Sequence, residues 1–294
     1  MKVGIYGQYY KGEAISYIEI LLKTLAQKDI EVIIEENFYN LIKINNLPEK
    51  EYQTFADYTD LDNSFEVMLT VGGDGTFLRA VTYVRDLNIP VLGVNVGRLG
   101  FLATVQKEAI SEAINLLLTK QYKIDERSLL TVSISQENTD LSDINFALNE
   151  ISVSRRNTTS MVTVETYLDN EYLTSYWADG LIVSTPTGST GYSLSCGGPV
   201  IAPSTKSLVL TPIAPHNLNA RPLVIPDNTN IKLKIIAREK QALLSLDSRI
   251  TTVDSHTEIF IKKASFTLKT IQLSQQSFLK TLREKLLWGE DKRN

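Results

Sequence analysis

The 294-residue sequence has few of the residues that mark several common classes of protein. Its single cysteine, Cys196, excludes a disulfide within the chain and is typical of a reducing compartment. The two histidines, His216 and His256, form no pattern of a structural zinc site with that cysteine. No apolar run approaches the length of a membrane-spanning helix, and Met1–Gly4 leads into a strand pattern rather than a signal peptide. These absences predict a soluble, cytoplasmic protein without a membrane partner.

The chain also lacks a net positive charge. The chain has 30 basic and 34 acidic residues, a net charge of −4, and therefore no basic surface that would indicate nucleic acid as a partner. It contains no Gly-Lys dipeptide, no Gly-x-Gly-x-x-Gly motif and no Gly-x-Ser-x-Gly motif. These absences exclude a Walker-type phosphate loop, the Rossmann fingerprint and the nucleophile turn of an α/β-hydrolase. A nucleotide, if one binds, must be held in another way.

The most informative stretch that is present runs from Phe65 to Leu78. An apolar run, Val67–Val71, is followed by the turn Gly72–Thr76 and then by apolar residues at helical spacing. A strand that enters a helix through glycines presents backbone N–H groups and a helix N-terminus to a phosphate. Within this turn, Asp74 is either a helix N-cap or a residue that handles a proton or a metal ion. The turn alone leaves both interpretations open.

The first third of the chain alternates strand and helix patterns. Strands are expected at Lys2–Tyr6, Ile30–Ile34 and Pro90–Val94, and a helix close to Leu41. A further helix is expected over 108–118. This alternation predicts a largely parallel sheet with helices on its faces, in a Rossmann-like α/β domain over residues 1–120.

From Tyr122 onward the pattern changes to short β-branched runs separated by turn residues. Asp169-Asn170 is a hairpin signal between two of these runs, and Ile144–Ser154 is expected as one strand. The density of strands predicts a β-sandwich domain over residues 121–274. Ser277 can cap a final helix, so residues 275–294 are expected to pack back on the first domain.

Two groups of polar residues in the second domain are candidates for a binding site. The segment 179–195 combines glycines with hydroxyl side chains, which suit phosphate or ribose oxygens but also occur in ordinary turns. Asn149-Glu150 interrupts an apolar run. The polar atoms of two such side chains must either form hydrogen bonds within the protein or serve a function. An amide beside a carboxylate can bind a base edge and a ribose diol. A solvent-facing strand end is the other interpretation.

Together these stretches resemble the NAD kinase family over most of the chain. The residues that carry the resemblance are Gly72–Thr76, Gly93–Asn95, Gly97–Leu102, Asn149-Glu150, Asp179-Gly180, Thr185–Tyr192, Pro215–Leu218 and Arg221-Pro222. The resemblance implies that ATP phosphorylates the 2′-hydroxyl of the adenosine ribose of NAD, with Mg²⁺ or another divalent cation, to give NADP. It also implies a homo-oligomer.

The same resemblance implies roles for individual residues. Asp74 is the expected general base, Asn149 is expected to bind adenine, and Glu150, where many members have Asp, is expected to bind the ribose hydroxyls. No residue is assigned as a metal ligand. The remaining substrate-binding residues that it implies are Gly73, Gly75, Thr76, Asp179, Thr187, Thr190, Gly191, Tyr192 and Ser195.

Two other functions stay open at this point. A lipid kinase of the diacylglycerol type shares the Gly-Gly-Asp-Gly turn, and a non-catalytic sensor would bind NAD without turning it over. The sequence also leaves open ATP or polyphosphate as the donor, NAD or NADH as the acceptor, and regulation by NADPH.

Overall fold

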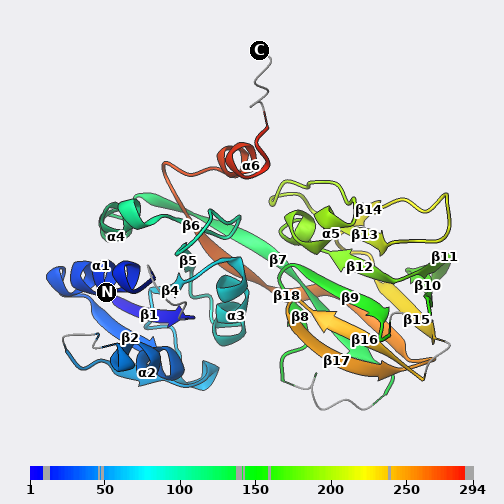
Figure 1. Cartoon of the computed structure of the whole chain (residues 1–294), viewed down its shortest axis with the longest axis horizontal. Coiled ribbons are helices and arrows are strands. Elements are labelled where there is room, and N and C mark those ends of the chain that lie inside the picture. The colour runs from blue at the N-terminus through cyan, green and yellow to red at the C-terminus, as the bar shows by residue number, and fades with distance from the viewer. Residues whose placement is uncertain are drawn as a thin grey trace. The chain divides into compact units, whose positions relative to one another are not determined.

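The computed structural model describes residues 1–8, 14–45, 47, 50–136, 141, 143–157, 160–237 and 240–288. The chain forms two compact units, the first Met1–Glu126 with Leu268–Asn294 and the second Arg127–Thr267. It passes from one unit to the other within β7 (Tyr122–Ile134) and β18 (Glu258–Leu273) (Figure 1). The domain limits predicted from the sequence, at 120/121 and 274/275, fall at the outer ends of these two strands and stay a prediction.

The first unit is an α/β structure, as the sequence predicts. Its sheet has the parallel order β3-β2-β1-β4-β5, with β6 and one residue of β18 also paired to β5. Its elements are β1 (Lys2–Gly7), α1 (Ala14–Gln27), β2 (Glu31–Glu35), α2 (Glu36–Ile44), β3 (Gln53–Phe55), η1 (Tyr58–Asp60), β4 (Val67–Val71), α3 (Asp74–Val84), β5 (Val91–Val94), β6 (Ala103–Val105), η2 (Lys107–Ala109), α4 (Ile110–Leu118) and α6 (Phe278–Leu286).

The centre of this sheet is apolar on both faces. Every residue of β4 is buried, which is usual for a parallel strand covered on both sides. Ile18, Leu21 and Leu25 of α1 pack in the same core as Ile114 of α4. The strand order reverses between β1 and β4, and ligands of such sheets bind outside the carboxyl ends of the strands at that point. The turn Gly72–Thr76 lies at this place in the sheet.

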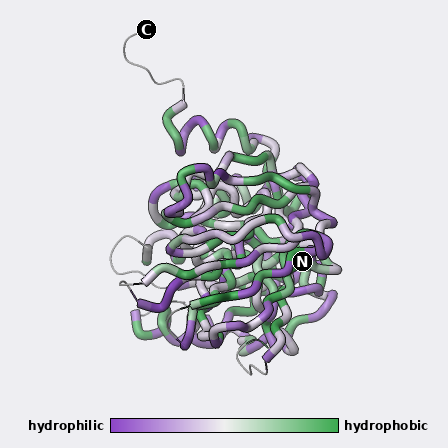
Figure 2. Tube along the Cα trace, turned by 90° about the vertical axis from the view of Figure 1, so that its right-hand side faces the viewer, coloured by the Kyte–Doolittle hydropathy of each residue, from purple (hydrophilic) through white to green (hydrophobic). Residues whose placement is uncertain are grey.

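The last helix is an amphipathic segment of the first unit. Ser277 is its N-cap, as predicted, and its side chain accepts a hydrogen bond from the N–H of Lys280. Figure 2 shows hydrophilic and hydrophobic residues alternating along this helix. Its buried residues are Thr281 and Leu282. Within the described part of the chain, no helix combines the length and the apolar character needed to span a membrane.

The second unit is a β-sandwich, which confirms the predicted fold class. One antiparallel sheet has the order β14-β13-β12-β9-β16-β17, and the other contains β11-β10-β15 and the first part of β18. Its elements are β8 (Phe146–Ala147), β9 (Glu150–Arg155), β10 (Val162–Leu168), β11 (Glu171–Ala178), β12 (Gly180–Ser184), η4 (Gly188–Thr190), α5 (Tyr192–Ser195), β13 (Ser207–Ile213), β14 (Leu223–Pro226), β15 (Ile231–Ala237), β16 (Gln241–Leu246) and β17 (Arg249–Asp254). Side chains of both sheets form one core.

Local predictions in this unit were partly right. Asp169 and Asn170 both have positive φ in the turn between β10 and β11, which confirms the hairpin. The single strand expected over 144–154 is wrong: the structure has two strands, β8 and β9, separated at Leu148 and Asn149. The strand breaks because the N–H groups of these two residues donate to the Asp247 carboxylate rather than to a neighbouring strand.

Candidate functional site

The glycine-rich turn after β4 forms the N-terminus of α3. Gly73 is the N-cap and Asp74 is the first helical residue, so the alternative that Asp74 is itself the N-cap is wrong. A methyl group added at Gly73 or Gly75 would have no described atom within 4 Å, apart from the adjacent residues and the backbone of the same helix. The first N–H groups of a helix have no partner inside it and favour a bound anion. The turn therefore has both the space and the donors to bind a phosphate.

The Asp74 carboxylate is held by the second glycine-rich turn. Its Oδ1 accepts the N–H groups of Leu102 and Ala103, each at 3.0 Å, and its Oδ2 accepts the N–H of Phe101 at 2.9 Å. A carboxylate has about four acceptor positions. Three are used here, so Oδ2 keeps one position for a further donor such as a hydroxyl group. This geometry orients Asp74 and leaves it able to accept one more hydrogen bond.

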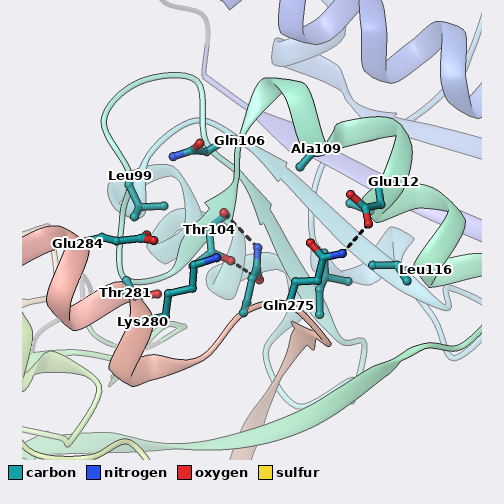
Figure 3. A pocket seen from close by; sticks show the side chains of 13 residues that line it. Leu99, Thr104, Gln106, Ala109, Glu112, Leu116, Gln275, Lys280, Thr281 and Glu284 are labelled. Carbon is teal, nitrogen blue, oxygen red and sulfur yellow. Dashed lines mark hydrogen bonds between the residues drawn. The ribbon is translucent and has the colours of Figure 1, made fainter.

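The close fit of these two turns explains a glycine in the second one. A Cβ atom at Gly100 would lie 2.0 Å from Oδ1 of Asp74. The turn is also supported from the C-terminal segment, because the side chain of Gln276 accepts from Thr104 Oγ1 at 2.7 Å and donates to the Thr104 carbonyl at 3.1 Å. These two bonds lie at a pocket of about 290 Å³ lined by β6, α4 and α6 (Figure 3).

Thr76 occupies an interior position in the first turn. Its side chain is buried, and its hydroxyl donates to Oε1 of Gln8 at 3.3 Å, just beyond the end of β1. A Cβ atom at Gly72 would lie 2.1 Å from this hydroxyl. Thr76 thus joins the start of α3 to the carboxyl end of β1, and its predicted contact with substrate stays a prediction.

In the second unit, Asp247 holds the backbone of residues 148–150. Its carboxylate accepts the N–H groups of Leu148, Asn149 and Glu150 at 2.9, 2.8 and 3.2 Å. Burial raises the pKa of Asp247, and these three hydrogen bonds lower it in part. The contact fixes the backbone from which the Asn149 and Glu150 side chains extend.

The side chains of Asn149 and Glu150 contain buried polar atoms without partners. Among the described residues, neither Oδ1 of Asn149 nor Oε2 of Glu150 accepts a hydrogen bond. Burial raises the pKa of Glu150 from 4.5 to about 8, and the Asp247 carboxylate adds to the rise. Unsatisfied buried acceptors are costly, by about 1–3 kcal/mol each, so their presence indicates a ligand that donates to them. They are not a solvent-facing strand end.

The hydroxyl-rich turn after β12 lies directly against this pair. A Cβ atom at Gly191 would be 3.3 Å from Oε2 of Glu150 and 3.4 Å from Nδ2 of Asn149. Thr187 is buried, and its carbonyl accepts the Thr190 hydroxyl at 3.2 Å. The turn therefore brings Gly191 against the unpaired Oε2 of Glu150 and the amide group of Asn149, with Thr190 directly before Gly191 and Thr187 four residues before it.

Three further predicted residues lie near the ends of this turn. Asp179 precedes β12 and forms an ion pair with Arg155 at 2.9 Å. Tyr192 begins α5 and is 46% exposed; burial and then the neighbouring Cys196, Asp179 and Glu150 raise the pKa of its hydroxyl. Ser195 is exposed at the end of α5, and within the described part of the chain it forms no hydrogen bond or ion pair with the other candidates. Tyr192 is therefore close to the Asn149–Glu150 pair, whereas Ser195 stays a prediction.

Sequence reasoning missed Asp247. The one available signal was the polar pair Asp247-Ser248 between two runs of strand character. In the structure this pair forms the turn between β16 and β17, and Asp247 has a φ of 51°. That signal predicts a hairpin but not which backbone the carboxylate contacts, because residues 148–150 are about a hundred positions earlier in the chain.

These two units together define a class of protein. The first carries a helix N-terminus with open space and an oriented carboxylate, and the second carries a buried amide and carboxylate with free acceptor positions. The first arrangement suits phosphate groups, and the second suits a base and a ribose. The chain is a nucleotide-binding protein of the α/β-plus-β-sandwich type.

Comparison with known proteins gives the family. The ATP-NAD kinase N-terminal domain matches residues 3–122, and the ATP-NAD kinase C-terminal domain matches residues 148–273. The NAD kinase of Christiangramia forsetii is 59% identical over the whole length of both chains. The crystal structure of yeast NADH kinase complexed with NADH has a TM-score of 0.88 at 24% identity, covering 99% of this chain and 88% of that one. The NAD kinase from Archaeoglobus fulgidus, solved in complex with ATP, has a TM-score of 0.74 at 24% identity, covering 97% and 99%. The chain belongs to the NAD kinase family.

The raised pKa of Glu150 predicts a specific dependence of stability on pH. The folded protein binds a proton that the unfolded chain releases above pH 4.5. The stabilisation that comes from binding this proton is complete below pH 4.5 and is lost as the pH rises through about 8. Glu150→Gln should therefore gain stability relative to the wild type between pH 5 and 8, by at most about 1.4 kcal/mol per pH unit. Urea unfolding of both proteins at several pH values measures this difference; parallel curves would contradict the buried, protonated Glu150.

The role of Asp247 predicts linked losses of stability and binding. In Asp247→Asn one oxygen becomes an NH₂ group that faces a backbone N–H, so roughly 1–3 kcal/mol of unfolding free energy should be lost. The affinity for NAD should fall as well, because Asn149 and Glu150 lose their fixed backbone. Asp254→Asn, an exposed carboxylate on the same hairpin, is the matched control and should change neither quantity. Calorimetry and denaturant unfolding provide the two measurements. If NAD binds to Asp247→Asn as to the wild type, the positioning role is wrong.

Proposed function

We infer that this chain is an enzyme that phosphorylates NAD. It transfers the γ-phosphoryl group of ATP to the 2′-hydroxyl of the adenosine ribose of NAD, giving NADP. One observation carries this inference: Asn149 and Glu150 each have a buried acceptor without a partner, Oδ1 and Oε2, and both side chains reach Gly191, through Nδ2 of Asn149 and Oε2 of Glu150. An amide that both donates and accepts can bind a base edge, and a carboxyl group can accept from a ribose diol.

The individual residues take the following proposed roles. Asn149 binds adenine and Glu150 binds ribose hydroxyls, while Gly191 allows the nucleotide to approach both. Tyr192, near Glu150 and Asp179, is proposed to contact the same nucleotide, and Asp179 the nicotinamide end. The turn residues that we propose to contact substrate or its phosphates are Gly73, Gly75, Thr76, Thr187, Thr190 and Ser195.

Asp74 is proposed as the general base. Phosphoryl transfer has a loose transition state, so an enzyme accelerates it mainly by positioning the reacting groups and stabilising charge. A base needs only to orient the hydroxyl and accept its proton late in the reaction. The unused acceptor position on Oδ2 of Asp74 suits a ribose hydroxyl, and the three N–H donors that hold the carboxylate keep it in one orientation.

Mg²⁺ or another divalent cation is the proposed cofactor. Within the described residues, no three His, Cys, Asp or Glu side chains gather to form a metal site. Mg²⁺ in kinases is commonly bound by substrate phosphates with only one or two carboxylates, so a single carboxylate at the turn fits this mode. When bound, the cation supplies neutralisation of the charge on the phosphoryl group.

The two alternatives left open by the sequence have less support. A lipid kinase shares only the glycine turn, whereas models of both ATP-NAD kinase domains match this chain. A non-catalytic sensor has no need of a carboxylate oriented with one free acceptor position. A cytoplasmic location and a homo-oligomer stay predictions.

Formation of the phosphorylated product tests whether the protein phosphorylates NAD. With NAD or NADH, ATP and Mg²⁺, the folded protein should form NADP or NADPH, read by an NADP-specific dehydrogenase. Glu150→Gln should raise KM for the NAD substrate more than KM for ATP, because hydrogen bonds donated by the ribose diol favour the carboxylate form of Glu150 in the complex, and a carboxylate accepts more of them than an amide does. The expected loss is roughly 1.5–3 kcal/mol. Absence of product from folded wild-type protein would refute the function, and a selective rise in KM for ATP would refute the role of Glu150.

Asp74→Asn separates catalysis from structure. The loss of a positioned base should lower kcat by about 10²–10⁴-fold. The amide should also cost roughly 1–3 kcal/mol of stability, because its NH₂ group faces a backbone N–H of residues 101–103. Rate and thermal midpoint are measured over a range of Mg²⁺ concentrations. Restoration of the rate by excess Mg²⁺ would identify Asp74 as a metal ligand instead.

Thr104→Val is the matched control for Asp74→Asn. It removes the Thr104 hydroxyl bond to Gln276 and so loosens the same turn without altering the carboxylate. It should lower the thermal midpoint and keep kcat within a few-fold of the wild type. A loss of kcat in Thr104→Val equal to that in Asp74→Asn would show that Asp74 acts only by holding the turn.

A further inference from the structure

Asn95 is a buried polar residue at the carboxyl end of β5. It follows Val94, the last residue of that strand, and is 2% exposed. A buried amide is costly unless its polar atoms form hydrogen bonds, so the groups that bind it show what it holds in place. Its backbone is fixed as well, because its N–H donates to the carbonyl of Val105 in β6 at 2.7 Å.

The Asn95 side chain closes the loop between β5 and β6. Its Oδ1 accepts the N–H of Gly97 at 2.7 Å, and its Nδ2 donates to the carbonyl of Ala103 at 3.1 Å. One partner lies at the start of the loop and the other at its end. The N–H of Gly100 also donates to the Ala103 carbonyl, but at 3.3 Å this bond is long for an N–H···O contact. The two Asn95 bonds are therefore the shorter connections across the loop 97–103.

This loop carries the three N–H groups that hold Asp74. Residues 101–103 donate to the Asp74 carboxylate, and they lie within the part of the chain that Asn95 closes. Ala103 is held on both sides, because its N–H binds Oδ1 of Asp74 at 3.0 Å and its carbonyl binds the Asn95 amide. A movement that turned the N–H of Ala103 away from Asp74 would therefore also disturb the bond to Asn95.

We propose that Asn95 is a positioning residue, which fixes the loop 97–103 and through it the orientation of the Asp74 carboxylate. The proposal rests on the inferred phosphorylation of NAD with Asp74 as the general base. The effect of Asn95 should appear in kcat, because a displacement of about 1 Å at a reacting group can lower a rate by about 10²-fold. The KM for NAD should change little, because the backbone of Asn149 and Glu150 is held by Asp247 instead.

Asn95→Ala removes both side-chain bonds and leaves the Asp74 side chain in place. It should lower kcat at least about tenfold and keep KM for NAD and for ATP within about threefold. Ser255→Ala is the matched control. In the second unit the Ser255 hydroxyl likewise accepts one N–H and donates to one carbonyl, both of Ala237, at 3.1 and 3.2 Å. This control should lower the thermal midpoint without changing kcat. A folded Asn95→Ala with the kcat of the wild type would overturn the proposal.

A double-mutant cycle separates the positioning of Asp74 from a general loss of structure. In Asp74→Asn the proposed base is already absent, so adding Asn95→Ala should lower kcat by less than about twofold further. A further loss as large as the one in the wild-type background would overturn the proposal. Asn95→Ser, which keeps a hydroxyl group at this position, takes the place of Asn95→Ala in both comparisons if the alanine variant does not fold.

Amide hydrogen exchange tests the loop without turnover. In Asn95→Ala the N–H groups of residues 101–103 should exchange at least about tenfold faster than in the wild type. The N–H groups of residues 148–150, which Asp247 holds in the same way, are the internal control and should keep their rates. If the wild type forms no NADP, the inferred function fails, but these rates still test whether Asn95 holds the loop. Unchanged exchange at residues 101–103 would refute that role.

Discussion

One interaction recurs in both units: a carboxylate that accepts the backbone N–H groups of three consecutive residues. Asp74 does this for residues 101–103 and Asp247 for residues 148–150. Hydrogen bonds to a charged group are the stronger ones, and three together fix a stretch of irregular backbone that no strand pairing holds. The candidate site depends on these two contacts, because one orients the proposed base and the other orients the pair proposed to bind adenosine.

The two carboxylates accept the same number of backbone N–H groups but differ in the groups that lie next to them. Asp74 is half-buried and keeps an acceptor position, so it can interact with a substrate as well as with its own turn. Burial raises the pKa of Asp247, and its carboxylate adds to the rise in the pKa of Glu150. The same interaction therefore orients the proposed general base, Asp74, in one unit and supports the proposed binding residues, Asn149 and Glu150, in the other.

Much of this could be predicted from the sequence, because the decisive signals are local. The strand, glycine turn and helix around Asp74 are adjacent in the chain, as are Asn149 and Glu150, and the alternating patterns predicted both fold classes. The contacts that could not be predicted join distant segments. Nothing near Asp74 indicates that residues 101–103 fold onto it, and nothing near Asp247 indicates residues 148–150. The break between β8 and β9 was missed for the same reason, since its cause lies in the β16–β17 turn.

The division of the first unit along the chain has a consequence for biosynthesis. Residues 127–267 form a continuous unit, whereas the first unit is completed by residues from Leu268 onward, including Gln276 and α6. A ribosome makes these residues after all of the second unit, and domains generally fold as units during synthesis. The β-sandwich can therefore fold while the nascent α/β unit still lacks its last strand and helix. The segment next to the turn that holds Asp74 therefore receives its two hydrogen bonds from Gln276 only late in translation.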